Sequence, residues 1–339
     1  MDNERKPIES DTEEDHPPVD NEQKPIELDA EEDHPPVETE QELIEQEPED
    51  NNPPENGQAN RQIARAAGVV MIGFVLSSLT GLLRQVMIAN VYGTEGIIDA
   101  FYAATVLPDT LFALVAGGAL SSAFIPTFTG FLAKQDKEGA WTLASAIGNL
   151  VFIVLTILSA LAWVYALPLV ETFIAPDFSA AQQALTAEML QILLLSQIIL
   201  GISGLLMGIL NSHQSFLLPA LAPTLYWVGI IFGLLVFVPG MGIHGLAWGT
   251  VLGAGLHLGI QLPGLFRLPG RKYSATLGLD NPSVRLVGKL IAPRLLGAAV
   301  VHLNFWVGSN LASGMVEGSL TAYKNAYMVM MMPQAIIAQ

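Results

Sequence analysis

The chain has 339 residues, a mean hydropathy of +0.45 and a formal net charge of −17, and it contains no cysteine. The lack of cysteine excludes disulfides, thiolate metal sites and cysteine nucleophiles. Residues 1–60 hold 22 acidic and 3 basic residues, a net charge of −19, whereas residues 61–339 hold 10 acidic and 12 basic residues, a net charge of +2. The composition predicts an acidic tail joined to a nearly neutral, apolar body.

The acidic tail is built from an 18-residue repeat. Residues 2–19 read DNERKPIESDTEEDHPPV, residues 20–37 read DNEQKPIELDAEEDHPPV, and residues 38–55 form a degraded third copy. Each copy has too few apolar residues to offset the entropy of ordering its backbone, so we expect residues 1–60 to be disordered. The EEDH cluster at residues 31–34 is a weak candidate for a divalent ion, and a solvated acidic tether is the simpler interpretation.

Eight apolar segments follow the tail. The run from Met189 to Phe266 has no Asp, Glu, Lys or Arg over 78 residues. A solvated protein surface does not allow such a run, but a bilayer does, since roughly 20 apolar residues cross its hydrocarbon core. We therefore predict an all-α polytopic membrane protein with about eight transmembrane helices, near residues 66–91, 99–127, 140–173, 184–210, 217–238, 243–265, 290–313 and 319–339.

The cationic loops predict the orientation. Lys and Arg lie before the first segment, after the second, and between the sixth and the seventh, whereas the alternate loops contain none. By the positive-inside rule the cationic side, with the tail, is cytoplasmic. The predicted organisation is a disordered tail at 1–60, a six-helix lobe at 61–266, a cytoplasmic loop with an amphipathic lead-in at 267–289, and the first two helices of a second lobe at 290–339. The last apolar segment reaches Gln339 without a polar flank, so a truncated second lobe is expected.

Arg84 is the most informative polar residue of the apolar segments. It lies about two turns from the outer end of the first segment, where an unpaired charge costs several kcal/mol and usually marks function. Ser77 and Thr80 share one helical face with it, together with the small residues Gly73 and Gly81. The alternative is that the arginine side chain reaches outward to the headgroups.

Other polar groups fall in the same membrane region. Asp99 begins the second segment, where it can offset the charge of Arg84 or cap its own helix, and the two roles are compatible. Asp109 follows Pro108, and it either bonds backbone groups freed by the proline or lines a cavity. Lys324 lies in the eighth segment at about the depth of Arg84, so the two residues form a cationic pair if their segments face each other.

Two further residues have simpler alternatives. Arg294 in the seventh segment shares one arc with His302, Ser309 and Ser313, and it lies close enough to the cytoplasmic mouth to reach the headgroups. His257 in the sixth segment fits a hydrogen bond between helices better than a ligand site.

The pattern of residues favours transport over catalysis. We find no metal-ligand spacing, glycine-rich phosphate loop or catalytic triad, and we expect no cofactor and no nucleic acid. Six prolines within or beside the segments indicate bent helices, as in transporters: Pro126, Pro168, Pro219, Pro223, Pro263 and Pro293. A few cationic side chains inside the membrane region favour a transporter for an anion or an anionic amphiphile.

Several short motifs occur in order from about residue 62 to 339, with no large gap. They are GLLRQ (81–85), DAFYA (99–103), LP (107–108), GALSSAFIP (118–126), GILN (208–211), LPALAP (218–223), GLAWG (245–249) and QLP (261–263). Each motif is weak alone, but together they resemble the MurJ/MviN family of the multidrug/oligosaccharidyl-lipid/polysaccharide exporter superfamily.

This resemblance implies a lipid II flippase of the bacterial plasma membrane. Such a protein moves the lipid-linked diphosphate precursor of peptidoglycan to the outer leaflet by alternating access. The expected partners are this cargo and membrane lipids. A cation or the membrane potential is the expected driving force, since an inside-negative potential favours outward movement of an anion. Arg84 and Asp99 match the family's arginine and aspartate of the first two helices. We expect the substrate site to contain Arg84, Asp99, Lys324, Arg294, Ser77 and Thr80.

The chain also departs from the family pattern. Arginines of the family are replaced by Ser78, Phe112, Ala113 and Met328, with Lys324 one turn before Met328 as a substitute, and a glutamate is replaced by Gly117. A less cationic cavity leaves two alternatives. One is an exporter of another polyprenyl-linked glycan or amphipathic compound, and the other is a membrane anchor that presents the acidic tail without transport.

Overall fold

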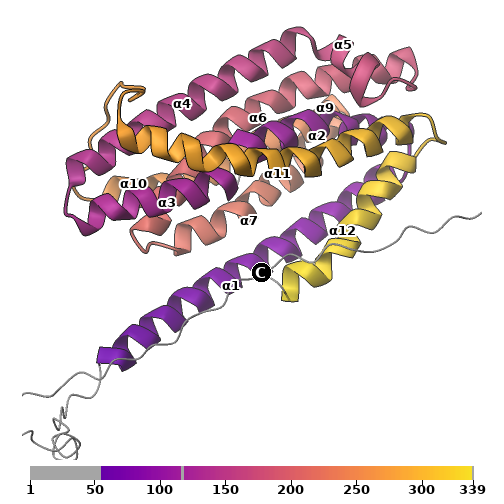
Figure 1. The fold of residues 1–339 in the computed structure, drawn as a ribbon. Helices are drawn as coiled ribbons and strands as arrows, with labels where there is room; N and C mark the ends of the chain where they lie inside the picture. The colour runs from indigo at the N-terminus through magenta and orange to yellow at the C-terminus, as the bar shows by residue number, and fades with distance from the viewer. Residues whose placement is uncertain (1–54, 116–117, 338–339) are drawn as a thin grey trace, which may run out of the picture. The chain divides into compact units, whose positions relative to one another are not determined.

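The computed structural model describes residues 55–115 and 118–337, and all regular secondary structure in this part of the chain is helical (Figure 1). The repeats of the predicted tail lie outside the described residues. The long helices are α1 (Glu55–Tyr92), α2 (Gly96–Val115), α3 (Gly118–Ala133), α4 (Lys137–Val164), α6 (Ala180–Ser212), α7 (Leu217–Phe232), α9 (His244–Gly259), α11 (Pro282–Ser313) and α12 (Ser319–Ile337). Short helices are α5 (Ala166–Leu169), α8 (Val238–Met241) and α10 (Leu262–Arg267), and π-helical turns follow α5 and α7.

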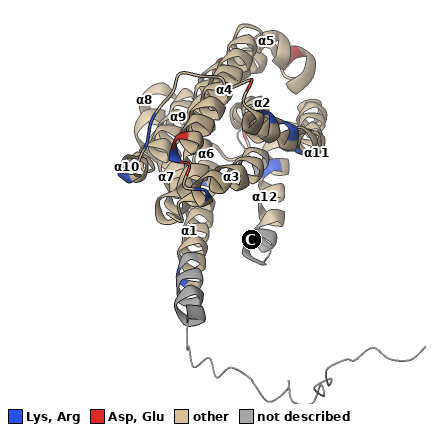
Figure 2. Ribbon diagram, turned by 60° about the vertical axis from the view of Figure 1, so that its left-hand side comes forward, with Lys and Arg blue, Asp and Glu red and all other residues tan. Residues whose placement is uncertain are grey.

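The predicted polytopic membrane fold is confirmed. Within the described residues, six helical segments are long and apolar enough to cross a bilayer: 67–92, 96–115, 137–164, 180–212, 217–241 and 282–313. The two other predicted segments correspond to α9, which has only 16 residues, and to α12, which contains Lys324 and Asn325. Charged residues are sparse along the long helices (Figure 2).

One predicted segment is divided in the structure. The segment expected at 99–127 contains α2 and α3, and residues 116–117 between them lie outside the described part of the chain. The segment expected at 140–173 is divided into α4, α5 and a π-helical turn that includes Val170–Ile174. Pro168 lies in α5, where it removes a backbone donor.

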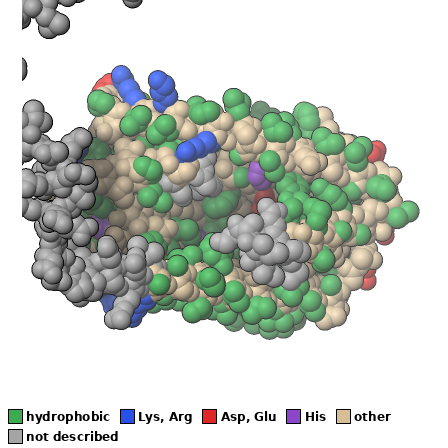
Figure 3. Space-filling view, turned by 60° about the horizontal axis from the view of Figure 1, so that its bottom comes forward, with side chains coloured by type: hydrophobic (Ala, Val, Ile, Leu, Met, Phe, Trp, Pro, Cys, Tyr) green, Lys and Arg blue, Asp and Glu red, His purple; other side chains and the backbone are tan. Residues whose placement is uncertain are grey.

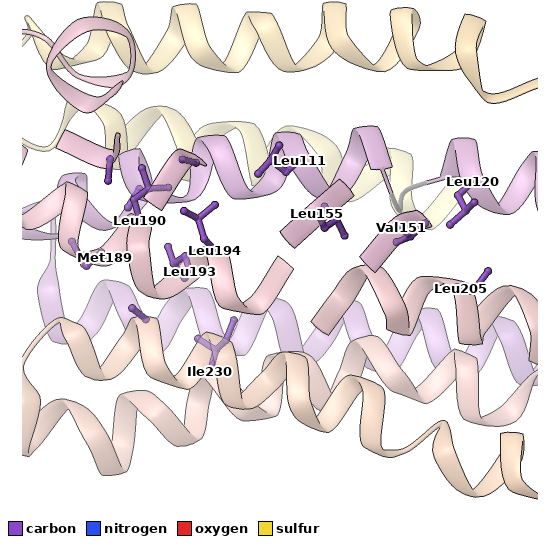
Figure 4. Close-up of a cluster of buried hydrophobic side chains, with 14 of the residues drawn as sticks. Leu111, Leu120, Val151, Leu155, Met189, Leu190, Leu193, Leu194, Leu205 and Ile230 are labelled. Atoms are coloured by element: carbon purple, nitrogen blue, oxygen red, sulfur yellow. The ribbon is translucent and has the colours of Figure 1, made fainter. Parts of the chain in front are cut away.

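Helix α6 carries the centre of the apolar core. Its residues Met189, Leu190, Leu193 and Leu194 are at most 1% exposed. Side chains from α2, α4 and α7 lie around them, including Leu111, Leu155 and Ile230 (Figure 4). By contrast, Met71, Leu79 and many other apolar side chains of α1 are exposed, as expected for a helix that faces lipid.

Glycines bring α7 and α9 into backbone contact. A Cβ atom on Gly229 would lie 2.3 Å from the Cα atom of Gly253, and one on Gly233 would lie 2.3 Å from the Cα atom of Gly249. Such short distances leave no room for a side chain. The four glycines therefore fix the approach of two helices that contribute walls to the cavity described below.

The segment between α10 and α11 is held against α4. Asn149 on α4 donates hydrogen bonds to the carbonyl groups of Ser274 (3.2 Å) and Thr276 (2.8 Å), and its carbonyl oxygen accepts one from the Tyr273 hydroxyl (2.8 Å). Helix α11 then begins at Pro282, with the Asn281 side chain as its N-cap. The predicted lead-in to the seventh segment is thus the first part of one continuous helix.

Candidate functional site

A cavity of about 550 Å³ lies between α1, α2, α7, α9 and α12. Its polar lining includes Ser77, Arg84 and Gln85 from α1, Asp109 from α2, and Lys324 from α12. Figure 3 shows the described part of the chain from a face that is hollowed between apolar side chains. The cavity therefore combines an apolar wall with a few charged groups, as ligand sites commonly do.

Arg84 lies in the wall of this cavity. Its guanidinium carbon is 4.5 Å from the centre of the Trp227 ring on α7, and its Nη2 atom donates a hydrogen bond to Gln85 Oε1 at 2.8 Å. Its buried Nε atom has no hydrogen-bond partner among the described residues. The arginine is held by neutral groups, so its charge remains available to an anion.

Gln85 joins three helices beside Arg84. Its Nε2 atom donates a hydrogen bond to the Tyr102 hydroxyl on α2 at 2.6 Å, and another to Asn325 Oδ1 on α12. Neither Gln85 nor Asn325 was among the predicted site residues. The position of Gln85, a polar amide next to Arg84 within an apolar segment, could have indicated its role.

Two other predicted residues of the first segment have different surroundings. Ser77 lines the cavity, and its Oγ atom accepts a hydrogen bond from Trp227 Nε1 at 3.2 Å. The Thr80 hydroxyl instead donates to the Leu76 carbonyl group of its own helix at 2.7 Å, and Thr80 does not line the cavity. A threonine commonly makes this bond within a helix, so sharing a face with Arg84 does not place it in the site.

Lys324 shares the cavity with Arg84. Its Nζ atom lies 5.2 Å from the centre of the Phe305 ring on α11. In the described residues neither cation forms an ion pair with a carboxylate. The structure thus places two cations that are 240 residues apart in sequence in one cavity. No carboxylate of the described residues contacts either charge.

Asp99 was predicted to offset Arg84, to cap its own helix, or both, but its hydrogen-bond partners in the structure lie on neither helix. Asp99 is 3% exposed and does not line the cavity. Its carboxylate oxygens accept hydrogen bonds from the backbone N–H groups of Gly318 and Thr321, each at 2.7 Å, and from the Thr321 hydroxyl. The first N–H groups of a helix lack partners within that helix. The Asp99 carboxylate accepts hydrogen bonds from these groups at the start of α12, and it therefore acts as a cap for α12.

Arg294 also lies outside the cavity. It is exposed on α11 and donates a hydrogen bond to Ser122 Oγ on α3. His257 is buried, and its Nδ1 atom lies 2.6 Å from Ser203 Oγ on α6, so the predicted hydrogen bond between helices is present. The described residues contain no group of three or more His, Asp or Glu side chains that could hold a metal ion.

Comparisons with known proteins identify the family of the chain. The family model for the lipid II flippase MurJ matches residues 88–339. The lipid II flippase MurJ of Burkholderia cenocepacia is 29% identical over 270 residues, which cover 78% of this chain and 52% of the relative. The probable lipid II flippase MurJ of Bdellovibrio bacteriovorus is 30% identical over 288 residues, which cover 82% and 54%. The chain spans about half the length of the curated relatives it matches.

Solved structures show the same fold. A lipid II flippase MurJ in an inward closed conformation superposes with a TM-score of 0.66 at 23% identity, over 79% of this chain and 56% of that structure. A transporter of the multidrug/oligosaccharidyl-lipid/polysaccharide superfamily from Pyrococcus furiosus gives a TM-score of 0.58 at 21% identity, over 82% and 61%. The family match covers most of the chain, and this chain belongs to the lipid II flippase MurJ family.

Proposed function

We propose that this protein is a transporter that moves lipid II from the cytoplasmic to the outer leaflet of the bacterial plasma membrane. The observation that carries the proposal is the cavity in which Arg84 and Lys324 face the same space without a carboxylate in contact with either. Membership of the flippase family supports the choice of a lipid-linked diphosphate as the cargo.

The two cations suit a diphosphate headgroup. A guanidinium group donates paired hydrogen bonds to phosphate oxygens, and an ammonium group adds a compact positive charge. Both groups are held by aromatic rings, so an entering phosphate has to displace no ion pair. Apolar side chains such as Phe74 and Met328 line the remaining wall, where the lipid part of the cargo has apolar contacts.

Alternating access requires the cavity to open to each side of the membrane in turn. An inside-negative potential favours outward movement of an anion by about 2.3 kcal/mol per charge per 100 mV. The membrane potential is therefore the proposed driving force, with the acidic tail on the cytoplasmic side. The tail has no part in this mechanism.

Complementation of bacteria depleted of their own flippase tests the proposal. We expect the protein, expressed with any sequence that follows residue 339 in its gene, to restore growth and cell-wall synthesis, and so should a variant of it that lacks residues 2–54. Arg84→Ala should fail, because it removes the charge that binds the headgroup. Arg285→Ala is the matched control, since Arg285 is an exposed arginine paired with Asp280 outside the cavity. Immunoblotting of membranes must show equal amounts of each variant.

Two outcomes would reject lipid II transport. Failure of the unmodified chain to restore wall synthesis, with export of another polyprenyl-linked glycan, would identify a related exporter. Growth with Arg84→Ala but not with the tail deletion would identify a membrane anchor that works through its acidic repeats.

A further inference from the structure

One wall of the cavity carries a negative charge that the proposed function does not use. Asp109 on α2 lines the same cavity as Arg84 and Lys324. It follows Pro108 in a helix whose other cavity residues are uncharged. A carboxylate in an anion-binding cavity weakens anion binding unless its charge can be removed.

Several charged or titratable groups face this carboxylate from the surrounding helices. Arg84 on α1, Lys324 on α12 and His302 on α11 act on it electrostatically, and so does the hydroxyl group of Tyr226 on α7. No ion pair with Asp109 occurs among the described residues. The carboxylate therefore acts on the two cations through space and leaves both accessible.

An anion bound to the two cations would also be repelled by an ionised Asp109. Charges interact more strongly in the interior of a membrane protein than in water, because the effective dielectric constant is lower. A proton on the carboxylate removes this repulsion. Anion binding and proton binding then favour each other, and the effect of each on the other must be equal.

We propose that Asp109 is a proton-binding site that is coupled to anion binding in this cavity. When a diphosphate group binds to Arg84 and Lys324, a proton from water binds to a carboxylate oxygen of Asp109, whose charge changes from −1 to 0. The proton returns to water when the anion leaves. The inference rests on the proposed function, and it adds a proton on Asp109 to the anion that the cavity binds.

The other titratable groups near the site are neutral: the cavity tyrosines Tyr102, Tyr226 and Tyr327, and His302 on α11. A tyrosine keeps its proton below about pH 10 in water, so the three tyrosines do not supply a change of charge near neutral pH. Histidine does titrate near neutral pH. His302, whose Nδ1 atom lies 3.4 Å from the Thr110 hydroxyl, is therefore the competing proton site that the experiment must separate from Asp109.

The experiment measures sulfate binding to the purified full chain in detergent micelles between about pH 5 and pH 8, where histidines and perturbed carboxylates change charge. Sulfate serves as the probe because it does not titrate in this range. We expect its affinity for the unmodified protein to fall about fivefold or more as the pH rises, which is the lower end of coupling between two sites. Asp109→Asn should bind sulfate with the same affinity throughout, and more tightly than the unmodified protein at the upper end.

Two control variants assign the effect to Asp109. His302→Gln should keep the pH dependence of the unmodified protein. Glu95→Gln, which removes an exposed carboxylate from the turn between α1 and α2, should keep it as well. Proton uptake on sulfate binding, followed with an indicator dye in weak buffer, should occur in both controls and be absent from Asp109→Asn.

Inorganic diphosphate and undecaprenyl diphosphate, compared at one pH, distinguish a free anion from a lipid headgroup. We expect the lipid to bind more tightly, and Asp109→Asn to bind both forms more tightly than the unmodified protein. Equal affinities for the two forms would assign the site to a free anion and overturn its role in lipid recognition. An unchanged pH dependence in Asp109→Asn, or its loss in His302→Gln, would overturn the inference and leave the proposed function standing. Lack of binding of every anion to every variant would overturn both.

Discussion

Asp99 on α2 accepts hydrogen bonds from both the backbone N–H and the hydroxyl group of Thr321 on α12. A third bond comes from the N–H group of Gly318, at which the chain adopts a positive φ of 87°. Lys324 follows Thr321 by one helical turn, so the two side chains lie on the same side of α12. The buried carboxylate thus fixes the start of the helix that carries one of the two cavity cations.

Asp99→Ala should therefore destabilise the protein. The change leaves two backbone donors and a hydroxyl group without their acceptor, at a cost of about 1–3 kcal/mol. Thermal unfolding in detergent micelles, followed by tryptophan fluorescence, measures the loss. Asp99→Asn keeps one acceptor oxygen and should have an intermediate midpoint.

Glu95→Ala is the control for the Asp99 variants, because it removes an exposed carboxylate from the adjacent turn. Its unfolding midpoint should equal that of the unmodified protein. If Asp99→Ala unfolded at the same temperature as Glu95→Ala, the contact between α2 and α12 would not contribute to stability.

The fold class was predictable because it depends on properties that are local in sequence. A run of 78 residues without a charge requires a membrane, and the lengths of the apolar segments approximate the spans. The division of the segment expected at 140–173 was missed, since apolar residues continue through it and hydropathy does not register where α4 ends and α5 begins. Pro168 was the available signal.

The candidate site was predictable only in part. Arg84, Ser77 and Lys324 line one cavity, and their depth in the apolar segments had indicated a shared region. The partner of Asp99 lies more than 200 residues later, at the start of a helix whose orientation no local pattern reveals. Trp227 was missed for a different reason: aromatic residues are common in membrane helices, and only tertiary packing places this one beneath a guanidinium group.

Gly253→Ala should disrupt the contact between α7 and α9. A Cβ atom at this position would lie 2.3 Å from the carbonyl oxygen of Tyr226, and a backbone atom of a packed helix cannot move aside as the end of a flexible side chain can. We expect a loss of stability of about 1–3 kcal/mol, as for other overpacked interiors. Thermal unfolding in micelles measures the difference.

Gly255→Ala is the matched control on the same helix, since a Cβ atom at Gly255 meets no atom within 4 Å. It should leave stability unchanged or raise it by up to about 1 kcal/mol, because alanine favours helix over glycine. Equal effects of the two substitutions would show that helix propensity, and not the approach of α7, decides the outcome.

Gln85→Leu should weaken both stability and transport. The substitution keeps a similar volume but removes the bonds from Gln85 to Arg84, Tyr102 and Asn325. Unpaired polar groups in a buried site cost about 1–3 kcal/mol. Complementation should be reduced as well, because Arg84 loses the acceptor that orients its guanidinium group. Gln191→Leu is the control, as Gln191 makes one exposed bond, to the carbonyl group of Trp163, and should complement normally.

Lys324→Gln should weaken the binding of inorganic diphosphate to the purified protein. The change removes one of two cations from the cavity while keeping a polar side chain of similar length. A charge-assisted hydrogen bond contributes roughly 1.5–3 kcal/mol, which corresponds to at least about a tenfold rise in Kd. Lys324→Arg should restore most of the affinity, because a guanidinium group also binds phosphate and also stacks on the Phe305 ring. Equal affinities of Lys324→Gln and the exposed control Arg285→Gln would mean that the anion contacts Arg84 alone.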